Sequence, residues 1–465
     1  MITQISAQHF KSWDNLPGFR LAPLTAFFGT NSSGKTSLLQ LLLMMKQTVE
    51  STDRSRVLHT GDHRTYVDLG TFYDLVYDHE QPGSISFELA WQLPKPLRIE
   101  NPEKARETLF DIRHLDFSML IKGSVDDIRV EQFEYRFDAY RFGMRKRTGK
   151  SKEKEKYDLV FDGYHLKRTP GRNWPLPRPV KSYAFPDQVN AYYQNAGFLS
   201  ELVFAFEELF KHLYYLGPLR EYPQRSYVWA GEQPQDVGQR GELAVPALLA
   251  SRARGTKISR GYRKRKKTVE ERVAECLREL GLIYSFSLQP IAENRKDYEV
   301  RVKRTKRSSE VHITDVGFGV SQILPVLVLC YYVPEGSTII LEQPEIHLHP
   351  AVQAGLADVF IDAIKTRNIQ IILESHSEHL LRRLQRRIAE ESFSYEDMAL
   401  YFAKMSNGDS ILEKLAIDLY GNIRNWPDNF FGDELGEMIE MAKVVARRKA
   451  GQSNGKEKQE HTPAA

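Results

Sequence analysis

The sequence predicts an α/β fold built around a strand, a glycine-bounded loop and a long helix, and three stretches support this prediction. The first, FFGTNSSGKTSLLQLLLMMK at positions 27–46, combines an apolar strand end, a loop and an apolar helix. The other two, STIILEQPEIHLHP at 337–350 and QIILESHSEHLLRRL at 370–384, are apolar runs that end in acidic and polar residues. Short apolar runs with polar ends are typical of the buried strands of α/β proteins.

The loop at 29–36 has the spacing G-x-x-x-x-G-K-[ST], which predicts a phosphate-binding loop for ATP. Its glycines permit a tight turn around phosphate oxygens, and the following helix directs its positive end at the anion. We expect Lys35 to reach the β- and γ-phosphates and Thr36 to offer its hydroxyl to Mg²⁺. The candidate nucleotide-binding residues here are Gly29, Asn31, Ser32, Ser33, Gly34, Lys35, Thr36 and Ser37.

The acidic end of the second stretch predicts the other side of the site. A buried strand beside a phosphate loop usually carries the carboxylate that holds Mg²⁺, and Glu342 occupies that position. The next residue, where an acid that positions the attacking water is expected, is Gln343, and Glu345 follows one residue further on. We therefore predict Thr36 and Glu342 as metal ligands and Gln343 or Glu345 as the residue that handles water.

Two further features complete the predicted site. His376 follows the apolar run at 370–374, where a histidine can hydrogen-bond a γ-phosphate. Gly317 and Gly319 precede an apolar helix that starts near Val320, and a helix N-terminus can bind phosphate. Ser321 belongs to the same turn, which alone would be a weak signal.

Composition limits the class of protein. The chain has 465 residues, 41% hydrophobic and 27% charged, which is enough for two or three structural units. No apolar run approaches the roughly 18–20 residues of a membrane span, and the N-terminus lacks a signal-peptide pattern. Cys276 and Cys330 have no metal-ligand spacing. We expect a cytoplasmic protein without disulfides or a membrane partner.

The chain order predicts a nucleotide-binding head in two lobes, 1–93 and 286–390, separated by an insertion at 94–285. The insertion is predicted to be β-rich at 94–190 and helical at 191–285, where NAGFLSELVFAFEELFKHLYYL (195–216) has helical apolar spacing throughout. A small α+β extension at 391–450 and a disordered tail at 451–465 complete the predicted organisation.

The order of these motifs resembles the head of the soluble ABC-type ATPases, in particular the SMC-like and OLD families. The resemblance implies a P-loop NTPase head with a mixed β-sheet, split by an insertion, in which ATP joins two copies through composite sites. Residue by residue, the matches are Gly34, Lys35 and Thr36 for Walker A, Glu342 for the Walker B aspartate, Gly319 for the signature glycine and His376 for the switch histidine. It covers roughly 1–90 and 286–390.

The sequence departs from the family's pattern in three respects. Gln343 stands where the catalytic glutamate is usual, so turnover is expected to be slow or to depend on Glu345. Gly317 stands where the signature serine is common. The family's glutamine-bearing loop falls in 64–79, where no residue can be assigned to it.

Three phrases, EQPEIHLHP, YYLGPLREYPQRSY and GNIRNWPDNFFGDE, resemble a subgroup of stand-alone bacterial ATPases. These ATPases often occur in anti-phage defence operons of the Septu, retron or PARIS kind. The resemblance implies an effector partner, a nuclease or a toxin, encoded nearby. After Leu384 we find no Asp-x-Asp pair following a buried strand, so a built-in Toprim nuclease is not predicted.

The basic stretch at 252–267 leaves three interpretations open. It is a solvated loop, a contact for the DNA backbone, or a contact for an acidic partner protein. The leading function is a homodimeric or higher-order Mg²⁺-dependent ATPase that acts as the sensor or regulator of an effector. The alternatives are an ATP-gated scaffold with little turnover, which Gln343 favours, and a DNA-repair or chromosome-maintenance ATPase.

Overall fold

The computed structural model describes residues 1–101, 107–125, 127–147, 156–171, 175–259, 265–427, 430 and 440–445. The chain divides into two units, Met1–Arg424 and Asn425–Ala465, and every element named below lies in the first. In the second unit, residues 440–445 are helical. The tail predicted at 451–465 lies outside the described residues.

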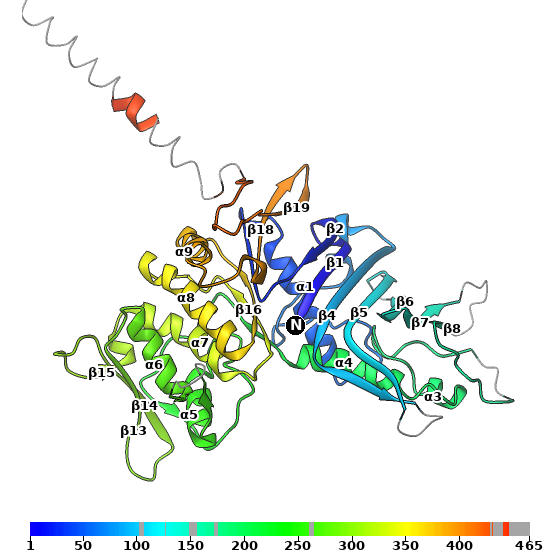
Figure 1. Ribbon diagram of the computed structural model, residues 1–465, viewed down its shortest axis with the longest axis horizontal. Coiled ribbons are helices and arrows are strands. Elements are labelled where there is room, and N and C mark those ends of the chain that lie inside the picture. The colour runs from blue at the N-terminus through cyan, green and yellow to red at the C-terminus, as the bar shows by residue number, and fades with distance from the viewer. Residues whose placement is uncertain are drawn as a thin grey trace, which may run out of the picture. The chain divides into compact units, whose positions relative to one another are not determined.

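The central sheet of the first unit has six strands in the order β19-β18-β3-β17-β16-β9 (Figure 1). All neighbours in it are parallel except β18 and β19. The strands are β3 (Leu24–Gly29), β9 (Leu213–Leu216), β16 (Thr338–Glu342), β17 (Gln370–Glu374), β18 (Met398–Ser406) and β19 (Asp409–Lys414). Because the carboxyl ends of parallel strands meet at one edge, the residues that follow β3, β16 and β17 come together there.

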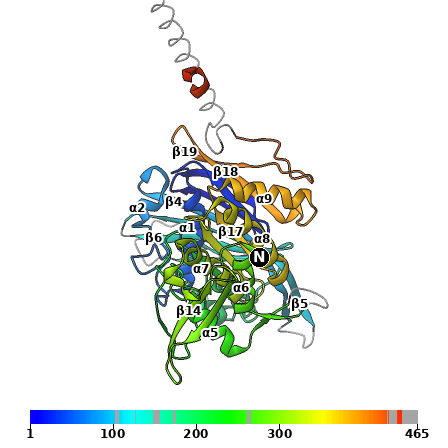
Figure 2. The ribbon, with the colours of Figure 1, turned by 90° about the vertical axis from the view of Figure 1, so that its left-hand side faces the viewer.

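Four helices alternate with the strands of this sheet along the chain. They are α1 (Lys35–Glu50), α7 (Phe318–Tyr332), α8 (Pro350–Arg367) and α9 (Glu378–Ala389). The sequences TIILE of β16 and QIILE of β17 are buried at every position, as expected for strands covered on both faces. The mixed α/β class predicted from the sequence is confirmed. Seen from the side, α8 and α9 pack together next to β17 and β18 (Figure 2).

A second sheet has seven antiparallel strands in the order β2-β1-β4-β5-β6-β7-β8. Its strands are β1 (Ile2–Phe10), β2 (Trp13–Arg20), β4 (Gly83–Glu100), β5 (Thr108–Gly123), β6 (Ile128–Phe137), β7 (Tyr140–Lys146) and β8 (Tyr157–Asp162). Helix α4 (Leu199–Lys211) packs against α1, and both contribute to the large apolar core under this sheet. Strand β4 runs through residue 93, and the lobe and insertion boundaries stay predictions.

Helices α5 (Ala244–Arg254) and α6 (Val269–Glu279) belong to a smaller group of elements in the first unit. Helix α6 packs on α5 and α7, as Figure 1 shows. The short elements are α2 (Phe72–Leu75), α3 (Gln188–Tyr192), β10 (Tyr227–Val228), β11 (Lys257–Ile258), β12 (Lys267–Thr268), β13 (Ser285–Pro290), β14 (Asp297–Lys303) and β15 (Val311–His312). Three 3₁₀ turns lie at Tyr77–His79, Ile313–Asp315 and Tyr395–Asp397.

One helix prediction was wrong. The segment 195–216 is helical only in α4, which ends at Lys211, and Leu213–Leu216 forms strand β9. All four residues of β9 are buried and pair in parallel with β16, an interaction that helical spacing in the sequence does not reveal. Tertiary pairing therefore overrides the local pattern here, as it often does for short apolar runs.

Candidate nucleotide-binding site

The loop between β3 and α1 is wound so tightly that two of its glycines are required. Gly29 has φ +141°, and a Cβ atom built on it would lie 2.0 Å from the carbonyl oxygen of Ala403 in β18. Gly34 has φ +85°, and its Cβ would lie 2.5 Å from Ser410 Oγ and 2.9 Å from Trp13 Nε1. A side chain at either position would be both strained and obstructed. The C-terminal strands β18 and β19 thus enclose the loop from behind.

The polar side chains of this loop bond mainly to the loop itself. Ser33 is buried and donates to the Thr30 carbonyl at 2.8 Å, and Ser37 donates to the Gly34 carbonyl at 2.6 Å. Asn31 and Ser32 are exposed. No side chain caps the start of α1, and its first turn has no acidic residue. The N–H groups at this helix end therefore remain available to an anion.

Lys35 lies inside the loop with only 3% of its surface exposed. Its Nζ donates to the carbonyls of Thr30 at 2.6 Å and Gly29 at 3.2 Å. Burial lowers the pKa of Lys35, and the nearby charge of Glu374 partly offsets that effect. A cation is thus held at the centre of the loop, where the sequence predicts contact with phosphate.

Two carboxylates lie side by side at the ends of adjacent strands. Glu342 ends β16 and Glu374 ends β17, and the two residues are paired in register. Thr36 Oγ1 donates to Glu374 Oε2 at 2.8 Å, and the Tyr215 hydroxyl donates to Glu342 Oε1 at 3.0 Å. Burial, followed by the charge of Glu374, raises the pKa of Glu342 to about 7. Burial also raises the pKa of Glu374, against the hydrogen bond from Thr36.

This oxygen-rich arrangement fits Mg²⁺. Among the described residues, no group of three or more His, Cys, Asp or Glu side chains is placed to hold a metal ion. Mg²⁺ does not need such a group, because it commonly takes one or two carboxylates together with substrate phosphates and waters. The hydroxyl of Thr36 and the carboxylates of Glu342 and Glu374 would supply the protein's share. Two buried carboxylates side by side are also unfavourable without a cation between them.

The sequence prediction did not include Glu374. The signal was present, because both β16 and β17 end in Ile-Ile-Leu-Glu. Only the parallel pairing of the two strands, however, turns that repetition into a pair of adjacent carboxylates.

The residues predicted to handle water lie just beyond these strands. Gln343 has φ +43°, and its backbone N–H continues the sheet by donating to the Glu374 carbonyl at 2.9 Å. Glu345 is buried, and its Oε1 accepts a hydrogen bond from the His376 backbone N–H at 2.7 Å, whereas Oε2 has no hydrogen-bond partner among the described atoms. Burial raises the pKa of Glu345, and the His376 hydrogen bond opposes this.

The side chain of His376 is exposed at the same edge of the sheet. Partial desolvation of the imidazole and the charge of Lys35 both lower the pKa of His376, so the neutral imidazole is favoured. Lys35, Thr36, Glu342, Glu345 and His376 therefore lie at one edge of the sheet, and their roles in binding nucleotide stay predictions.

The glycine turn before α7 has a different setting. Gly317 has an ordinary backbone conformation, no atom lies within 4 Å of its Cβ position, and Ser321 donates to the Phe318 carbonyl at 2.7 Å. A Cβ on Gly319 would be in ordinary contact with Leu348, 3.6 Å away. The ring of Phe318 lies 5.6 Å from that of Tyr222 and 5.4 Å from that of His347. The described contacts of this turn are thus with Tyr222, after β9, and with the loop after β16, and not with the phosphate loop.

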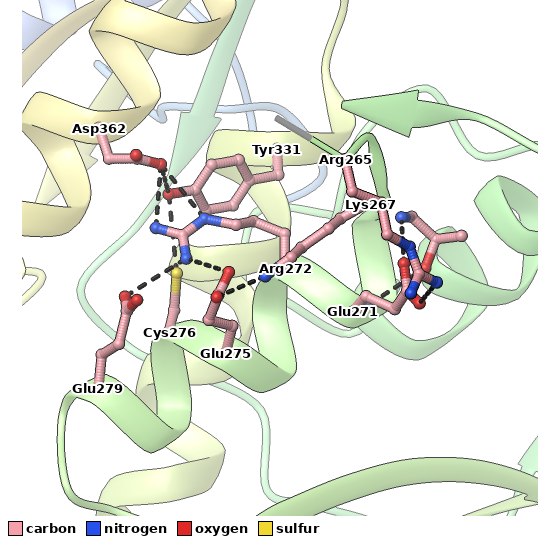
Figure 3. Close-up of polar contacts among 10 residues, drawn as sticks. Arg265, Lys267, Glu271, Arg272, Glu275, Cys276, Glu279, Tyr331 and Asp362 are labelled. Atoms are coloured by element: carbon pink, nitrogen blue, oxygen red, sulfur yellow. Dashed lines mark hydrogen bonds and ion pairs between the residues drawn. The ribbon is translucent and has the colours of Figure 1, made fainter. Parts of the chain in front are cut away.

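Much of the described part of the basic stretch is paired within the protein. Arg252 forms an ion pair with Glu270, Arg265 with Glu271, and Lys267 with Glu275. The last two pairs border the network of Arg272, which joins α6 to Tyr331 of α7 and Asp362 of α8 (Figure 3). Residues 260–264 lie outside the described residues. These pairs reduce the positive charge available to DNA.

Two family models match parts of the chain. Residues 252–381 match the family model described as AAA ATPase domain, and residues 394–441 match that of a protein of unknown function, DUF3696. The chain thus carries a P-loop ATPase domain, a class that binds nucleotide, typically with Mg²⁺. The matched segment contains the glycine turn, β16 and β17, and the phosphate loop lies before it. No curated protein matches the chain.

The solved structures similar to this chain include three SMC head domains. The head bound to the C-terminal winged-helix domain of ScpA has a TM-score of 0.46 at 10% identity, covering 89% of this chain and 98% of that one. The head from Thermotoga maritima has 0.40 at 11%, covering 90% and 99%. A head with an extended coiled coil, bound to the C-terminal domain of ScpA derived from Pyrococcus furiosus, has 0.44 at 9%, covering 96% and 99%.

Two further features of the structure concern membrane-spanning helices and disulfides. Within the described part of the chain, every helix is too short or too polar to cross a membrane. Cys276 and Cys330 are buried free thiols.

Proposed function

We propose that this chain binds Mg·ATP at the edge formed by β3, β16 and β17 and hydrolyses it slowly. The observation that carries the proposal is the convergence of Lys35, Thr36, Glu342 and Glu374 from three adjacent strand ends. Lys35 would neutralise phosphate charge, and Thr36 with Glu342 and Glu374 would hold the metal. Bound Mg²⁺ would neutralise charge that develops on the phosphate oxygens.

Slow turnover follows from the residues that replace the usual base. Gln343 carries an amide, which orients a water but does not remove its proton. Glu345 is the nearest carboxylate that follows it, and one of its oxygens is occupied by the His376 N–H. Its other oxygen is the group we assign to the attacking water. His376 itself would contact the γ-phosphate as a neutral imidazole.

We further propose that ATP joins two or more copies of the chain. Gly317, Gly319 and Ser321 would contact the nucleotide of a second copy through the N-terminal end of α7, which has no side-chain cap and no acidic residue in its first turn. Exposure of Phe318, at 39%, is consistent with a surface that another chain covers.

The regulatory part of the proposal rests on resemblance alone. An ATPase that assembles in this way would act as the sensor or regulator of an effector, a nuclease or toxin encoded nearby, in anti-phage defence. The phrases EQPEIHLHP and YYLGPLREYPQRSY support that role only through the subgroup they resemble. We also propose a cytoplasmic location, which the two buried free thiols support.

A second candidate function is an ATP-gated scaffold that holds a partner and turns over little nucleotide. Gln343 is the observation that favours it, because an amide in place of the base slows hydrolysis without weakening binding. A DNA-directed role through residues 252–267 has less support, since Arg252, Arg265 and Lys267 already pair with glutamates.

Phosphate release with Mg·ATP, combined with mass measurement with and without ATP, tests these proposals. Lys35→Ala serves as the blank. Turnover that disappears in Lys35→Ala and falls strongly in Glu345→Gln supports the ATPase cycle, and Gln343→Glu should then be faster than the natural chain. Assembly with ATP but without turnover supports the scaffold. No effect of nucleotide on either measurement would contradict both.

A further inference from the structure

The segment after β9 contains a buried cation that the site described so far does not use. This segment belongs to YYLGPLREYPQRSY, at 214–227, and β9 pairs with β16 at the far side of the sheet from the phosphate loop. Tyr215 of β9 donates its hydroxyl to Glu342 Oε1 at 3.0 Å. Five residues later, Arg220 is only 6% exposed.

The guanidinium of Arg220 lies against the end of β16. Its Nη2 donates to the Glu342 carbonyl at 3.4 Å, and its Nη1 is buried with no hydrogen-bond partner among the described atoms. Burial lowers the pKa of Arg220 to about 10, and the nearby carboxylates of Glu342 and Glu345 oppose this effect. A buried charge with an unsatisfied N–H is costly, and such groups often persist because function requires them.

Glu342 and Glu374, the two carboxylates proposed to hold the metal, have similar surroundings. Glu374 accepts a hydroxyl hydrogen bond from Thr36, and the cation whose charge acts on it is Lys35. Glu342 accepts a hydroxyl hydrogen bond from Tyr215, and the cation whose charge acts on it is Arg220. One hydroxyl and one buried cation thus accompany each carboxylate, the first pair from the phosphate loop and the second from the segment after β9.

We propose that Arg220 is a positioning residue of the nucleotide site, which fixes the loop from Glu342 to Glu345 so that Glu342 presents its carboxylate to Mg²⁺. The inference rests on the proposed binding of Mg·ATP. Arg220 acts on the metal through Glu342, as residues outside the first ligand shell commonly do. Loss of such supporting residues typically lowers metal affinity about 10- to 100-fold.

The same segment offers a matched control. Arg225 lies five residues further on, is exposed, and pairs with Asp315 at 2.8 Å. Removing its charge alters the segment without touching Glu342. Arg220→Lys keeps a cation but cannot reproduce a planar guanidinium, so it should restore part of the function.

The test is the Mg²⁺ concentration that gives half-maximal enhancement of ATP binding, measured for the natural chain, Arg220→Gln, Arg220→Lys and Arg225→Gln. We expect Arg220→Gln to raise it at least about tenfold, Arg220→Lys to give an intermediate value and Arg225→Gln to stay within about twofold. Affinity for ATP in EDTA should be unchanged in all four, and thermal unfolding should show that each variant is folded.

Failure of this inference and failure of the proposed function give different results. If the natural chain binds Mg·ATP and Arg220→Gln has the same Mg²⁺ requirement, Arg220 does not position Glu342. The same conclusion follows if folded Arg220→Gln loses ATP affinity equally in EDTA, or if folded Arg220→Lys needs as much Mg²⁺ as Arg220→Gln. If the natural chain binds no nucleotide, the proposed function is overturned and this inference with it.

Discussion

Two helices of this protein begin after a glycine, and their beginnings differ in how they are surrounded. At α1, Gly34 has a left-handed conformation, and Trp13, Ser12 and Ser410 surround it so closely that no Cβ fits. At α7, Gly317 has an ordinary conformation with open space at its Cβ position. Neither helix has a side-chain cap or an acidic residue in its first turn.

The difference separates an enclosed half-site from an open one. The end of α1 is completed by its own chain, which supplies Lys35, Glu342 and Glu374 around it. The end of α7 has Phe318 exposed beside it, and its first turn has neither a side-chain cap nor an acidic residue. Helix ends of both kinds bind phosphate, so the open one is suited to a nucleotide held by another copy.

The largest effect on Mg·ATP affinity is expected from adding a methyl group at Gly34, inside the enclosed half-site. Gly34→Ala would be strained at φ +85° and obstructed by Ser410 Oγ at 2.5 Å. Such strain costs about 1–3 kcal/mol, and the loop must shift to accept it, so Mg·ATP affinity should fall about 5- to 140-fold. Calorimetric titration measures the change.

Gly336→Ala is the matched control for that experiment. Gly336 has φ +80° but nothing within 4 Å of its Cβ position. The substitution should lower stability while leaving ATP affinity unchanged. Equal loss of affinity in both variants would mean that the enclosure of Gly34 has no specific role.

A second variant breaks the open half-site alone. Gly319→Glu adds a negative charge at the start of α7, where an anion would otherwise bind. We expect Mg·ATP affinity within about twofold of the natural chain, because phosphate is held by the other helix, together with loss of ATP-dependent assembly and turnover. Mass measurement and phosphate release report the two outcomes. Gly197→Glu adds the same charge at an exposed glycine outside the site, with nothing within 4 Å of its Cβ position, and is the control that should change neither. Intact assembly in Gly319→Glu would contradict the comparison.

The same contrast explains what could be predicted from the sequence. The phosphate loop was identifiable because all its determinants lie within the eight residues from Gly29 to Thr36. Its enclosure was not, since Ala403 and Ser410 belong to strands near the other end of the chain. Glu342 was identifiable as the acidic end of an apolar run, whereas the partnership with Glu374 required the register of β16 and β17.

The segment after β9 shows the limit most clearly. Helical spacing continued through Leu213–Leu216, so the strand was missed, and with it the position of Tyr215 and Arg220 beside Glu342. Arg220 and Glu342 are 122 residues apart, and only strand pairing joins them. Residue types at a motif are local information, but the residues that support a motif come from the tertiary structure.

The smallest effect is expected from a change in pH. It should alter Mg²⁺-dependent ATP binding at the enclosed half-site and leave the open half-site unaffected. The pKa of Glu342 is raised from 4.5 to about 7, so lowering the pH through 7 protonates the carboxylate that Mg²⁺ requires. The Mg²⁺-dependent part of ATP binding should fall about tenfold between pH 8 and pH 6, in proportion to the ionised fraction. In the absence of nucleotide, pH has the opposite effect on the stability of the folded protein. Because the folded state binds more protons between pH 4.5 and about 7, stability falls as pH rises through that range.

Titration of Mg²⁺ against the ATP-bound protein at several pH values measures this effect. Glu342→Gln is the control, because it removes the carboxylate and leaves only the titration of the nucleotide itself. The open half-site has no acidic residue in the first turn of α7, so Gly319→Glu should retain the pH dependence of the natural chain. A pH dependence that persists in Glu342→Gln would assign the titration to another group, of which Glu374, whose pKa is also raised by burial, is the first to test.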